Sequence, residues 1–326
     1  MKMVKLITIF LLGLNVVHGD MVDLAAWEKQ SPEDLTDLLA IQERLRELLP
    51  DAKKALVSIE AGDGAGSGVI VSKEGLVLTA AHVIGKTGKK MQVRLPTGKR
   101  NSAVTLGGSE ISDAAMLKIK GEGEWPFVAI AKRGESKVGD WCFGLGHPGG
   151  FDKDRGIVVR VGKIIAKKDE TMQTDSRLLG GDSGGPLFDF DGRLIAIHSR
   201  VSQKPDQNFH VPVESFLANW ETFRDEELIS YDLMQDGGFF GVACEEIEAG
   251  LIVREVIPGT AAEKAGLKLN DILLEVNDEP LDSREEFIII ISSLKPGDEA
   301  RILYQRDEAQ LSVKVNLGVR PKVAEE

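Results

Sequence analysis

Between residues 54 and 200 the chain is divided into short apolar runs, and glycine-containing turns separate these runs at close intervals. The runs are rich in valine and isoleucine, which are typical of β-strands. They read ALVSIEA, GSGVIVS, GLVLTAAHVI, MQVRLPTG, AAMLKIKG, GIVVRVGKIIA and RLIAIHS. Long helical patterns do not alternate with them, which disfavours a parallel sheet built from β-α-β units. The pattern predicts an all-β sandwich or barrel.

The length of 326 residues exceeds what one hydrophobic core usually organises, so we expect two folded units. An amphipathic stretch, VPVESFLANWETF, is followed by the charged sequence RDEEL, and we place the boundary there. The second unit has the usual size of a small domain and contains strand patterns and a helix that Ser283 and Glu286 begin in capping-box spacing. The predicted organisation is a β domain at 54–228, a second domain at 229–320 and a tail at 321–326.

Residues 1–19 have the pattern of a secretory signal peptide. Lys2 and Lys5 precede an apolar run from Leu6 to Val17, and the small residue Gly19 follows it. This run is shorter than the roughly 20 residues that cross a bilayer, which disfavours a membrane anchor. We therefore expect the mature protein in the periplasm or outside the cell.

The segment 20–53 contains SPEDLTDLLAIQERLRELLP, which predicts an amphipathic helix ending near Pro50. Ser31 and Asp34 stand in capping-box spacing, and Pro32 occupies the expected first helical position. The leucine periodicity does not decide which surface this helix meets. A helix packed on its own domain and an arm that contacts another subunit are both open.

The formal net charge of −12 argues against nucleic acid as a partner. Apart from the signal region, the chain carries the cysteines Cys142 and Cys244, and the predicted boundary puts them in different domains. This excludes a disulfide framework, and we do not expect a single bridge between the domains either.

The stretch FDFDGRLIAI predicts a β-hairpin that turns at Asp191-Gly192. Its acidic pair resembles part of a calcium loop, but the remaining ligand positions are missing. The glycine-rich stretch at residues 62–68 lacks the lysine of a phosphate-binding loop and leads into a strand. We therefore expect no metal, nucleotide or other cofactor.

The stretch LLGGDSGGPLFDF surrounds Ser183 with glycines. A serine hydroxyl is a weak nucleophile at neutral pH and needs a base and a third group that orients the base. His82 in LVLTAAHVI is the candidate base, and Asp113 in SEISDAAMLKIK is the candidate orienting acid. Histidine, aspartate and serine in this order form one of the convergent catalytic triads. The glycines allow the N–H groups of Gly181 and Ser183 to point at one spot, an oxyanion hole.

The blocks TAAHV, SDAAMLKI and GGDSGGPL resemble the triad blocks of chymotrypsin-like serine proteases. With GSGVIVSKEGLVLTAAHVI and VGDWCFGLGHPGG, the chain resembles the HtrA (Deg) family of ATP-independent quality-control proteases. The resemblance covers about residues 54–320. It implies a mostly β architecture, a trypsin-like double β-barrel followed by a PDZ domain, with the N-terminal helix in front.

By resemblance, His82 is the general base, Asp113 the orienting acid and Ser183 the nucleophile, and Gly181 and Ser183 donate to the oxyanion. The reaction implied is cleavage of unfolded or damaged proteins through an acyl-enzyme. The C-terminal unit is similar to the family's PDZ domain, with the carboxylate-binding loop at Phe239, Phe240, Gly241 and Val242. The family implies protein C-termini as ligands and a homotrimer as the assembly. A catalytically silent protein that binds peptides through the PDZ groove is the alternative.

The sequence departs from the family at the nucleophile, because Asp182 stands where asparagine is usual. We expect Asp182 to accept backbone N–H groups of its own loop, and not to pair with an amino terminus freed by cleavage. The walls of the specificity pocket are expected at 177–182 and in the strand Ile197–Val201. The resemblance implies a pocket for small or medium apolar side chains. Strand alternation puts 197, 199 and 201 on one face and 198 and 200 on the other. If His198 or Arg200 faced inward, the preference would shift toward polar or acidic side chains, and we favour the apolar pocket. His147 and His210 are predicted to be structural, because no acid and serine accompany them.

Overall fold

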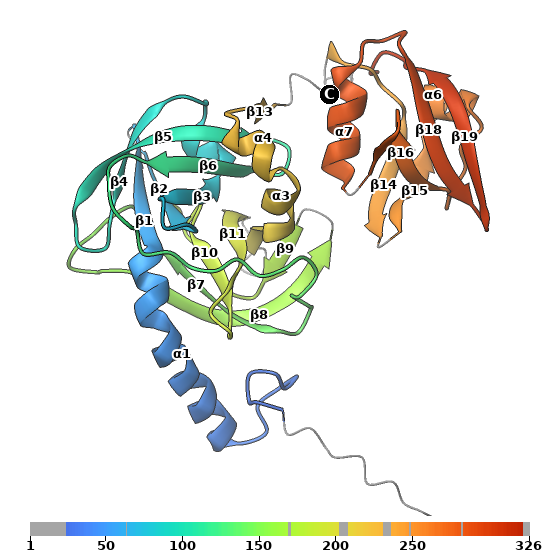
Figure 1. Ribbon diagram of the computed structural model, residues 1–326. Coiled ribbons are helices and arrows are strands. Elements are labelled where there is room, and N and C mark those ends of the chain that lie inside the picture. The colour runs from blue at the N-terminus through green and yellow to red at the C-terminus, as the bar shows by residue number, and fades with distance from the viewer. Residues whose placement is uncertain are drawn as a thin grey trace, which may run out of the picture.

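The computed structural model describes residues 24–62, 64–168, 171–201, 208–230, 236–247, 249–281 and 283–321 (Figure 1). The predicted signal peptide and the tail after residue 321 lie outside the described residues. Two β-barrels and a third, separate sheet form the molecule, which confirms the predicted mostly β architecture.

The first barrel is a ring of six antiparallel strands. They are β1 (Leu56–Ala61), β2 (Gly64–Ile70), β3 (Leu76–Ala80), β4 (Lys90–Arg94), β5 (Arg100–Ser109) and β6 (Ala114–Ile119). They pair in the order β5-β4-β1-β2-β3-β6, and pairing of β5 with β6 closes the ring. A short strand, β13 (Leu228–Ile229), adds to β5 in parallel. The interior is filled by side chains such as Val57, Val77 and Leu117, which are fully buried.

The second barrel also has six strands. They are β7 (Trp141–Gly146), β8 (Val158–Lys168), β9 (Thr171–Thr174), β10 (Pro186–Asp189), β11 (Leu194–Val201) and β12 (Asn208–Pro212). The closed order is β10-β11-β12-β9-β8-β7. Helices α3 (Val213–Ala218) and α4 (Trp220–Arg224) follow it. Phe143 and Phe188 stack in the core with their ring centres 5.1 Å apart.

The third sheet belongs to the C-terminal domain. Its strands are β14 (Val242–Ile247), β15 (Gly250–Val256), β16 (Ile272–Val276), β17 (Glu279–Pro280), β18 (Glu299–Arg306) and β19 (Ala309–Asn316). The path β14-β15-β16-β18-β19 leaves β14 at an edge, and helices α6 (Ala261–Lys264) and α7 (Arg284–Ser293) accompany the sheet. Ser283 caps α7 by accepting the Glu286 N–H at 3.1 Å, as its spacing predicted. This domain has a hydrophobic core of its own, around residues such as Val253, Leu273 and Ile302.

Helix α1 (Leu35–Ala55) differs from its prediction at both ends. Asp34 is the N-cap, because its carboxylate accepts the Asp37 N–H at 3.0 Å, and the helix continues through Pro50. A proline inside a helix removes one hydrogen bond. Here the turn after it is retained while Ala52 and Ala55 are buried in the core of the first barrel.

The leucines of α1 differ in burial between the two ends of the helix. Near the body, Leu45 and Leu48 pack against the core, so this part of α1 packs on its own chain. At the far end of the helix in Figure 1, Leu35 and Leu39 are exposed.

The predicted hairpin joins β10 to β11, but its turn is longer than the two residues expected. Gly192 alone of the two turn residues has a positive φ, of 84°. The side chain of Asp189 closes the turn by accepting the N–H groups of Asp191 and Arg193 at 3.0 and 2.8 Å.

Two further sequence-based expectations concern cysteines and membranes. Cys142 in β7 and Cys244 in β14 are both free, which confirms that they are not bridged. Within the described ranges, every helix is too short or too polar to cross a membrane.

Candidate active site

His82 and Asp113 come together at the edge of the first barrel. His82 lies in the short helix α2 (Ala81–Ile84) directly after β3, and Asp113 directly precedes β6, which pairs with β3. The Asp113 carboxylate lies 2.9 Å from His82 Nδ1 and also accepts the His82 backbone N–H at 3.0 Å. Asp113 has a φ of 61°, a left-handed conformation that aspartate tolerates better than most residues. Its main-chain carbonyl accepts the Ala81 N–H at 3.0 Å, so backbone and side chain both hold the pair.

Ser183 lies in the loop before β10, on the second barrel. Its hydroxyl donates to the main-chain carbonyl of Ser199 at 3.1 Å. The hydroxyl of Ser199 in turn donates to Asp113 Oδ2 at 2.5 Å. Ser199 therefore connects Ser183 with the His82–Asp113 pair. Among the described residues, no hydrogen bond joins Ser183 Oγ to His82, so the resting hydroxyl is turned toward Ser199.

The electrostatics of the pair suit a base and its orienting acid. The hydrogen bond to Asp113 raises the pKa of His82 above 6.5, although burial acts in the opposite direction. Burial raises the pKa of Asp113, but the hydrogen bond and charge of His82 and the Ser199 hydroxyl outweigh it, and the pKa falls below 3.8. Asp113 is therefore ionised at neutral pH, and a proton that reaches His82 is stabilised there.

The strand that carries Ser199 breaks the predicted alternation. In the pairing of β11 with β12, His198 opposes His210 and Arg200 opposes Phe209, so Ser199 is the extra residue of a β-bulge. The bulge shifts the register between His198 and Arg200, so the expectation of alternating faces was wrong here. Residues 197 to 199 are all buried. The bulge is what aims the Ser199 hydroxyl at Asp113, and Arg200 lies over the Phe209 ring at 5.4 Å.

Gly181 provides the geometry that an oxyanion hole requires. Its φ is 93°, and a Cβ at this position would lie 2.5 Å from Gly149 N and 2.6 Å from His147 O. The Gly180 carbonyl accepts the Gly149 N–H at 2.7 Å, and because the peptide is trans, the Gly181 N–H points the opposite way. Within the described part of the chain, the N–H groups of Gly181 and Ser183 have no acceptor. Two such donors are available for an oxygen that gains negative charge.

Ser67 of β2 fixes the nucleophile loop to the first barrel. Its N–H donates to the Ser183 carbonyl at 2.8 Å, and its hydroxyl donates to the Gly181 carbonyl at 3.0 Å. The Ser67 hydroxyl also accepts the His147 N–H at 3.1 Å. One serine thus ties both predicted oxyanion-hole residues to the opposite barrel.

The other histidines of the described residues, His147, His198 and His210, are buried. His198 Nδ1 lies 2.9 Å from His210 Nδ1, and His210 Nε2 lies 2.8 Å from the hydroxyl of Thr174. Burial lowers the pKa of His210 to about 3 and that of His147 to about 4. Both stay neutral in the physiological range, which is consistent with the structural roles predicted for them.

Comparisons with known proteins agree with this architecture. The family model of the trypsin-like peptidase domain matches residues 66–197, and that of the PDZ domain matches residues 238–317. A probable periplasmic serine endoprotease, DegP-like, from Ectopseudomonas mendocina is 31% identical over 285 residues, 80% of this chain and 58% of that protein. A protein of the same description from Chlamydia pneumoniae is 29% identical over 301 residues, 84% of this chain and 58% of that protein.

Solved structures give the same result. The serine endoprotease from Yersinia pestis is 26% identical with a TM-score of 0.55, and the match covers 84% of this chain and 97% of that chain. The HtrA-type protease AlgW with a tripeptide shares the fold, at 23% identity and a TM-score of 0.57, over 85% of this chain and 98% of that one. The chain belongs to the HtrA family. It carries one PDZ domain and spans 58% of the length of the two curated relatives.

Two residues of this site were not anticipated from the sequence. Ser199 was assigned only to a pocket wall, and Ser67 was read only as part of a strand. The sequence does contain a signal for Ser199, since three polar residues, His-Ser-Arg, interrupt an otherwise apolar strand. For Ser67 the sequence contains no comparable signal, because the partners of its hydroxyl, His147 and Gly181, lie 80 and 114 residues away in the chain.

The raised pKa of His82 leads to a first prediction. In a proton NMR titration, His82 should titrate with a midpoint above 6.5, and Asp113→Asn should lower that midpoint because the imidazolium loses its carboxylate. His147, with a pKa of about 4, provides an internal control that should not move. A wild-type midpoint at or below 6.5, or one that Asp113→Asn leaves in place, would contradict the proposed pairing.

The hydroxyl of Ser199 leads to a second prediction. Ser199→Ala removes one donor to Asp113 and keeps the main-chain carbonyl that holds Ser183, so kcat should fall about tenfold, the loss expected for one hydrogen bond to a charged group. Steady-state peptide hydrolysis is the measurement. The matched control is Ser102→Ala, on the exposed surface of β5. Equal activity of the two variants would show that the Ser199 hydroxyl does not support the base.

Proposed function

We propose that this protein is a serine endopeptidase of the periplasm or extracellular space that cleaves unfolded or damaged polypeptides without a cofactor. The observation that carries the proposal is the chain of contacts from Ser183 through Ser199 to Asp113 and His82. The DegP-like relatives, named as periplasmic serine endoproteases, support the same reaction and location. In this proposal His82, Asp113 and Ser183 are the catalytic triad.

The reaction begins when the Ser183 hydroxyl leaves the Ser199 carbonyl and turns to His82. Ser183 Oγ attacks the carbonyl carbon of the scissile peptide bond while its proton passes to His82 Nε2. The oxygen of the tetrahedral intermediate accepts hydrogen bonds from the Gly181 and Ser183 N–H groups. His82 then donates the proton to the leaving nitrogen, and the carbon–nitrogen bond breaks to give an acyl-enzyme. Water, deprotonated by His82, hydrolyses the ester and restores Ser183.

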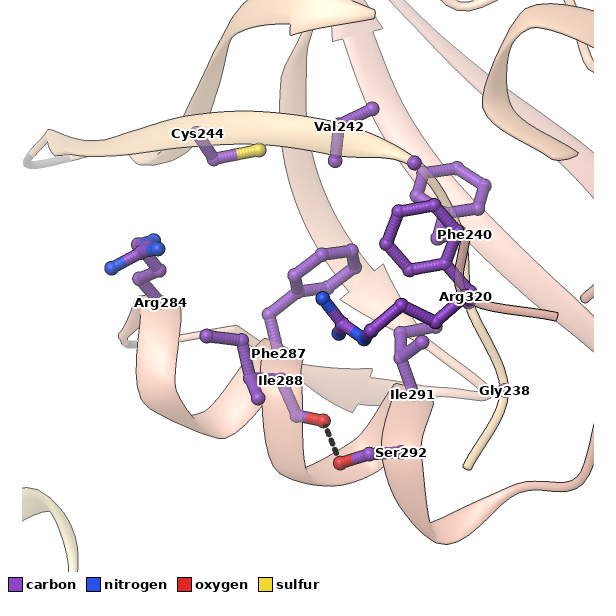
Figure 2. A pocket seen from close by; sticks show the side chains of 12 residues that line it. Gly238, Phe240, Val242, Cys244, Arg284, Phe287, Ile288, Ile291, Ser292 and Arg320 are labelled. Carbon is purple, nitrogen blue, oxygen red and sulfur yellow. Dashed lines mark hydrogen bonds between the residues drawn. The ribbon is translucent and has the colours of Figure 1, made fainter. Parts of the chain in front are cut away.

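The PDZ domain supplies a groove for an extended peptide. The groove lies between the edge strand β14 and helix α7, and Figure 2 shows Val242 on one side and Phe287, Ile288 and Ile291 on the other. A peptide can add to the open edge of a sheet as a further strand, with its side chains in the adjacent pockets. The apolar lining supports binding of peptides with apolar ends.

The loop before β14 supports recognition of a terminal carboxylate. Gly238 and Phe239 use their N–H groups in hydrogen bonds to Leu294 O and Gly318 O. In the described residues, the N–H groups of Phe240 and Gly241 have no such acceptor. Arg320 lines the same end of the groove, and its guanidinium lies 4.7 Å from the centre of the Phe239 ring. Two open donors and a cation suit the carboxylate of a protein C-terminus. Phe239, Phe240, Gly241 and Val242 are therefore the proposed binding loop.

The competing function is a catalytically silent peptide binder. The resting hydrogen bond of Ser183 to Ser199 is compatible with it, because the hydroxyl must turn before it meets His82. The open donors of the Gly181 and Ser183 N–H groups favour the peptidase. Both functions use the PDZ groove, so only the chemistry of Ser183 distinguishes them.

A third prediction tests the chemistry of Ser183. The wild type should be labelled by a fluorophosphonate and should cleave casein, whereas Ser183→Ala should not be labelled and should lose about a millionfold in kcat. The Ser102→Ala variant serves as the matched serine control. A wild type that neither labels nor cleaves, even with apolar C-terminal peptides added, would establish the silent binder.

A fourth prediction tests the groove. Ile288→Glu places a charge on the apolar wall and should weaken binding of a fluorescent peptide with an apolar C-terminal residue by at least about tenfold, equivalent to ~1.4 kcal/mol. Leu311→Glu on the exposed face of β19 is the control and should bind normally. Amidation of the peptide terminus should weaken binding to the wild type as well. Unchanged affinity in Ile288→Glu, or for the amidated peptide, would argue against this groove and loop.

A further inference from the structure

The residue directly before the nucleophile carries a charge that is fully buried. Asp182 has no exposed side-chain surface, and its Oδ2 forms an ion pair with Arg160 Nη2 at 2.7 Å. The Arg160 side chain is itself only 12% exposed and comes from β8 of the second barrel. The sequence analysis expected Asp182 to use backbone donors of its own loop, and one exists, the Leu179 N–H at 2.8 Å. The arginine partner was not foreseen.

The ion pair belongs to the interior of the barrel. Arg160 lies opposite Gly144 in the pairing of β7 with β8. Gly146, the last residue of β7, leaves the space for the aspartate, because a Cβ there would overlap with the Asp182 carboxylate. A carboxylate in such a place needs a counter-charge, since a buried and unpaired charge is strongly unfavourable.

The Asp182 carboxylate also determines the shape of the loop that carries the oxyanion donors. Asp182 Oδ2 accepts the Leu179 N–H, and the Asp182 N–H returns to the Leu179 carbonyl at 3.0 Å. The Asp182 carbonyl accepts the Gly185 N–H at 2.8 Å. Gly180 and Gly181 lie inside this closed turn, so the direction of the Gly181 N–H depends on where the Asp182 side chain is held.

We propose that Arg160 is a positioning residue for the oxyanion hole: it is a built-in counter-ion that holds Asp182, and through it the turn of Gly180 and Gly181, in the catalytic conformation. Arg160 then supplies the positive charge that neutralises Asp182. A freed amino terminus is not required as the counter-ion. This inference rests on the proposed peptidase function and adds to it the interaction that keeps the oxyanion hole formed.

The groups around Asp182 determine how its charge responds to pH. Burial raises its pKa, and the Leu179 N–H, Arg160 and the more distant Arg155 act in the opposite direction. His198 of β11 lies near Arg160, and burial keeps its pKa well below 6.5, so it adds no charge. Removal of Arg160 should therefore raise the pKa of Asp182 further and make it bind a proton as the pH falls.

The test compares four proteins, the wild type, Arg160→Met, Asp182→Asn and the double variant. Arg160→Met leaves an unpaired carboxylate beside the nucleophile, so kcat should fall about 100-fold, the loss expected for one oxyanion donor, with KM little changed. The double variant contains no buried charge at this place and should recover to within about tenfold of the wild type. Arg160→Lys retains a cation and should keep more activity than Arg160→Met. Lys168→Met removes a charge from the exposed end of the same strand and is the matched control.

The pH dependence separates positioning from a loss of folded protein. The ratio of kcat in Arg160→Met to kcat in the wild type should rise as the pH falls from 8 to 5.5, because protonated Asp182 no longer needs a counter-ion. Acetylation of the wild-type amino terminus should leave kcat unchanged within twofold. A normal kcat in Arg160→Met, no recovery in the double variant, a ratio that does not change with pH, or loss of activity on acetylation would each overturn the inference.

Failure of the proposed function would be visible separately. A wild type that fluorophosphonate does not label refutes the peptidase, whatever the Arg160 variants do. In that case the thermal unfolding of the four proteins tests the ion pair itself. The melting temperature of the double variant should fall by less than the sum of the decreases in the two single variants. Additive changes in melting temperature would overturn the pairing of Arg160 with Asp182.

Discussion

The hydrogen bonds of the Asp113 carboxylate are the interaction on which the candidate site depends, because they join the two barrels there. Its Oδ1 accepts the His82 backbone N–H, and His82 Nδ1 lies 2.9 Å from both carboxylate oxygens. Its Oδ2 also accepts the hydroxyl of Ser199 in the second barrel. Neither barrel contains a complete site. The positive φ of Asp113 allows its backbone to hold α2 while its side chain holds the imidazole. Pairing of β3 with β6 therefore brings Asp113 to His82, and the hydroxyl of Ser199 reaches the same carboxylate from β11.

A second set of contacts holds the nucleophile loop, from Ser67 in the first barrel and from Arg160 in the second. Ser67 binds the carbonyl groups of Gly181 and Ser183, and Arg160 neutralises the aspartate between them. The loop is thus fixed by main-chain hydrogen bonds on one side and by a buried charge pair on the other. Fixed donors of this kind do not have to reorganise when charge develops in the transition state, which is the source of their contribution to catalysis.

The groove of the PDZ domain differs from the candidate active site, because it lies along the open edge of a sheet, at β14. The core of this domain is separate from that of the barrels. Among the described residues, the N–H groups of Phe240 and Gly241 have no backbone acceptor, and they lie beside the open edge of β14 and an apolar wall. In the proposed binding mode, a peptide would complete the sheet and cover the wall in a single step, so recognition of a chain end would use ordinary strand pairing.

The sequence by itself predicted the β architecture, the helix cap at Ser283 and the unbridged cysteines. It also singled out His82, Asp113 and Ser183 as the candidate triad. These follow from local signals, since strand periodicity, capping spacing and the residue types of the triad can each be read within a few positions. It misjudged the end of α1 at Pro50 and the alternation around Ser199, because burial and a bulge override local preference. Only the tertiary structure decided the roles of Ser199, Ser67 and Arg160. Their partners are distant in the chain, and which atoms meet depends on strand register and barrel closure, which a change of one residue in pairing would alter completely.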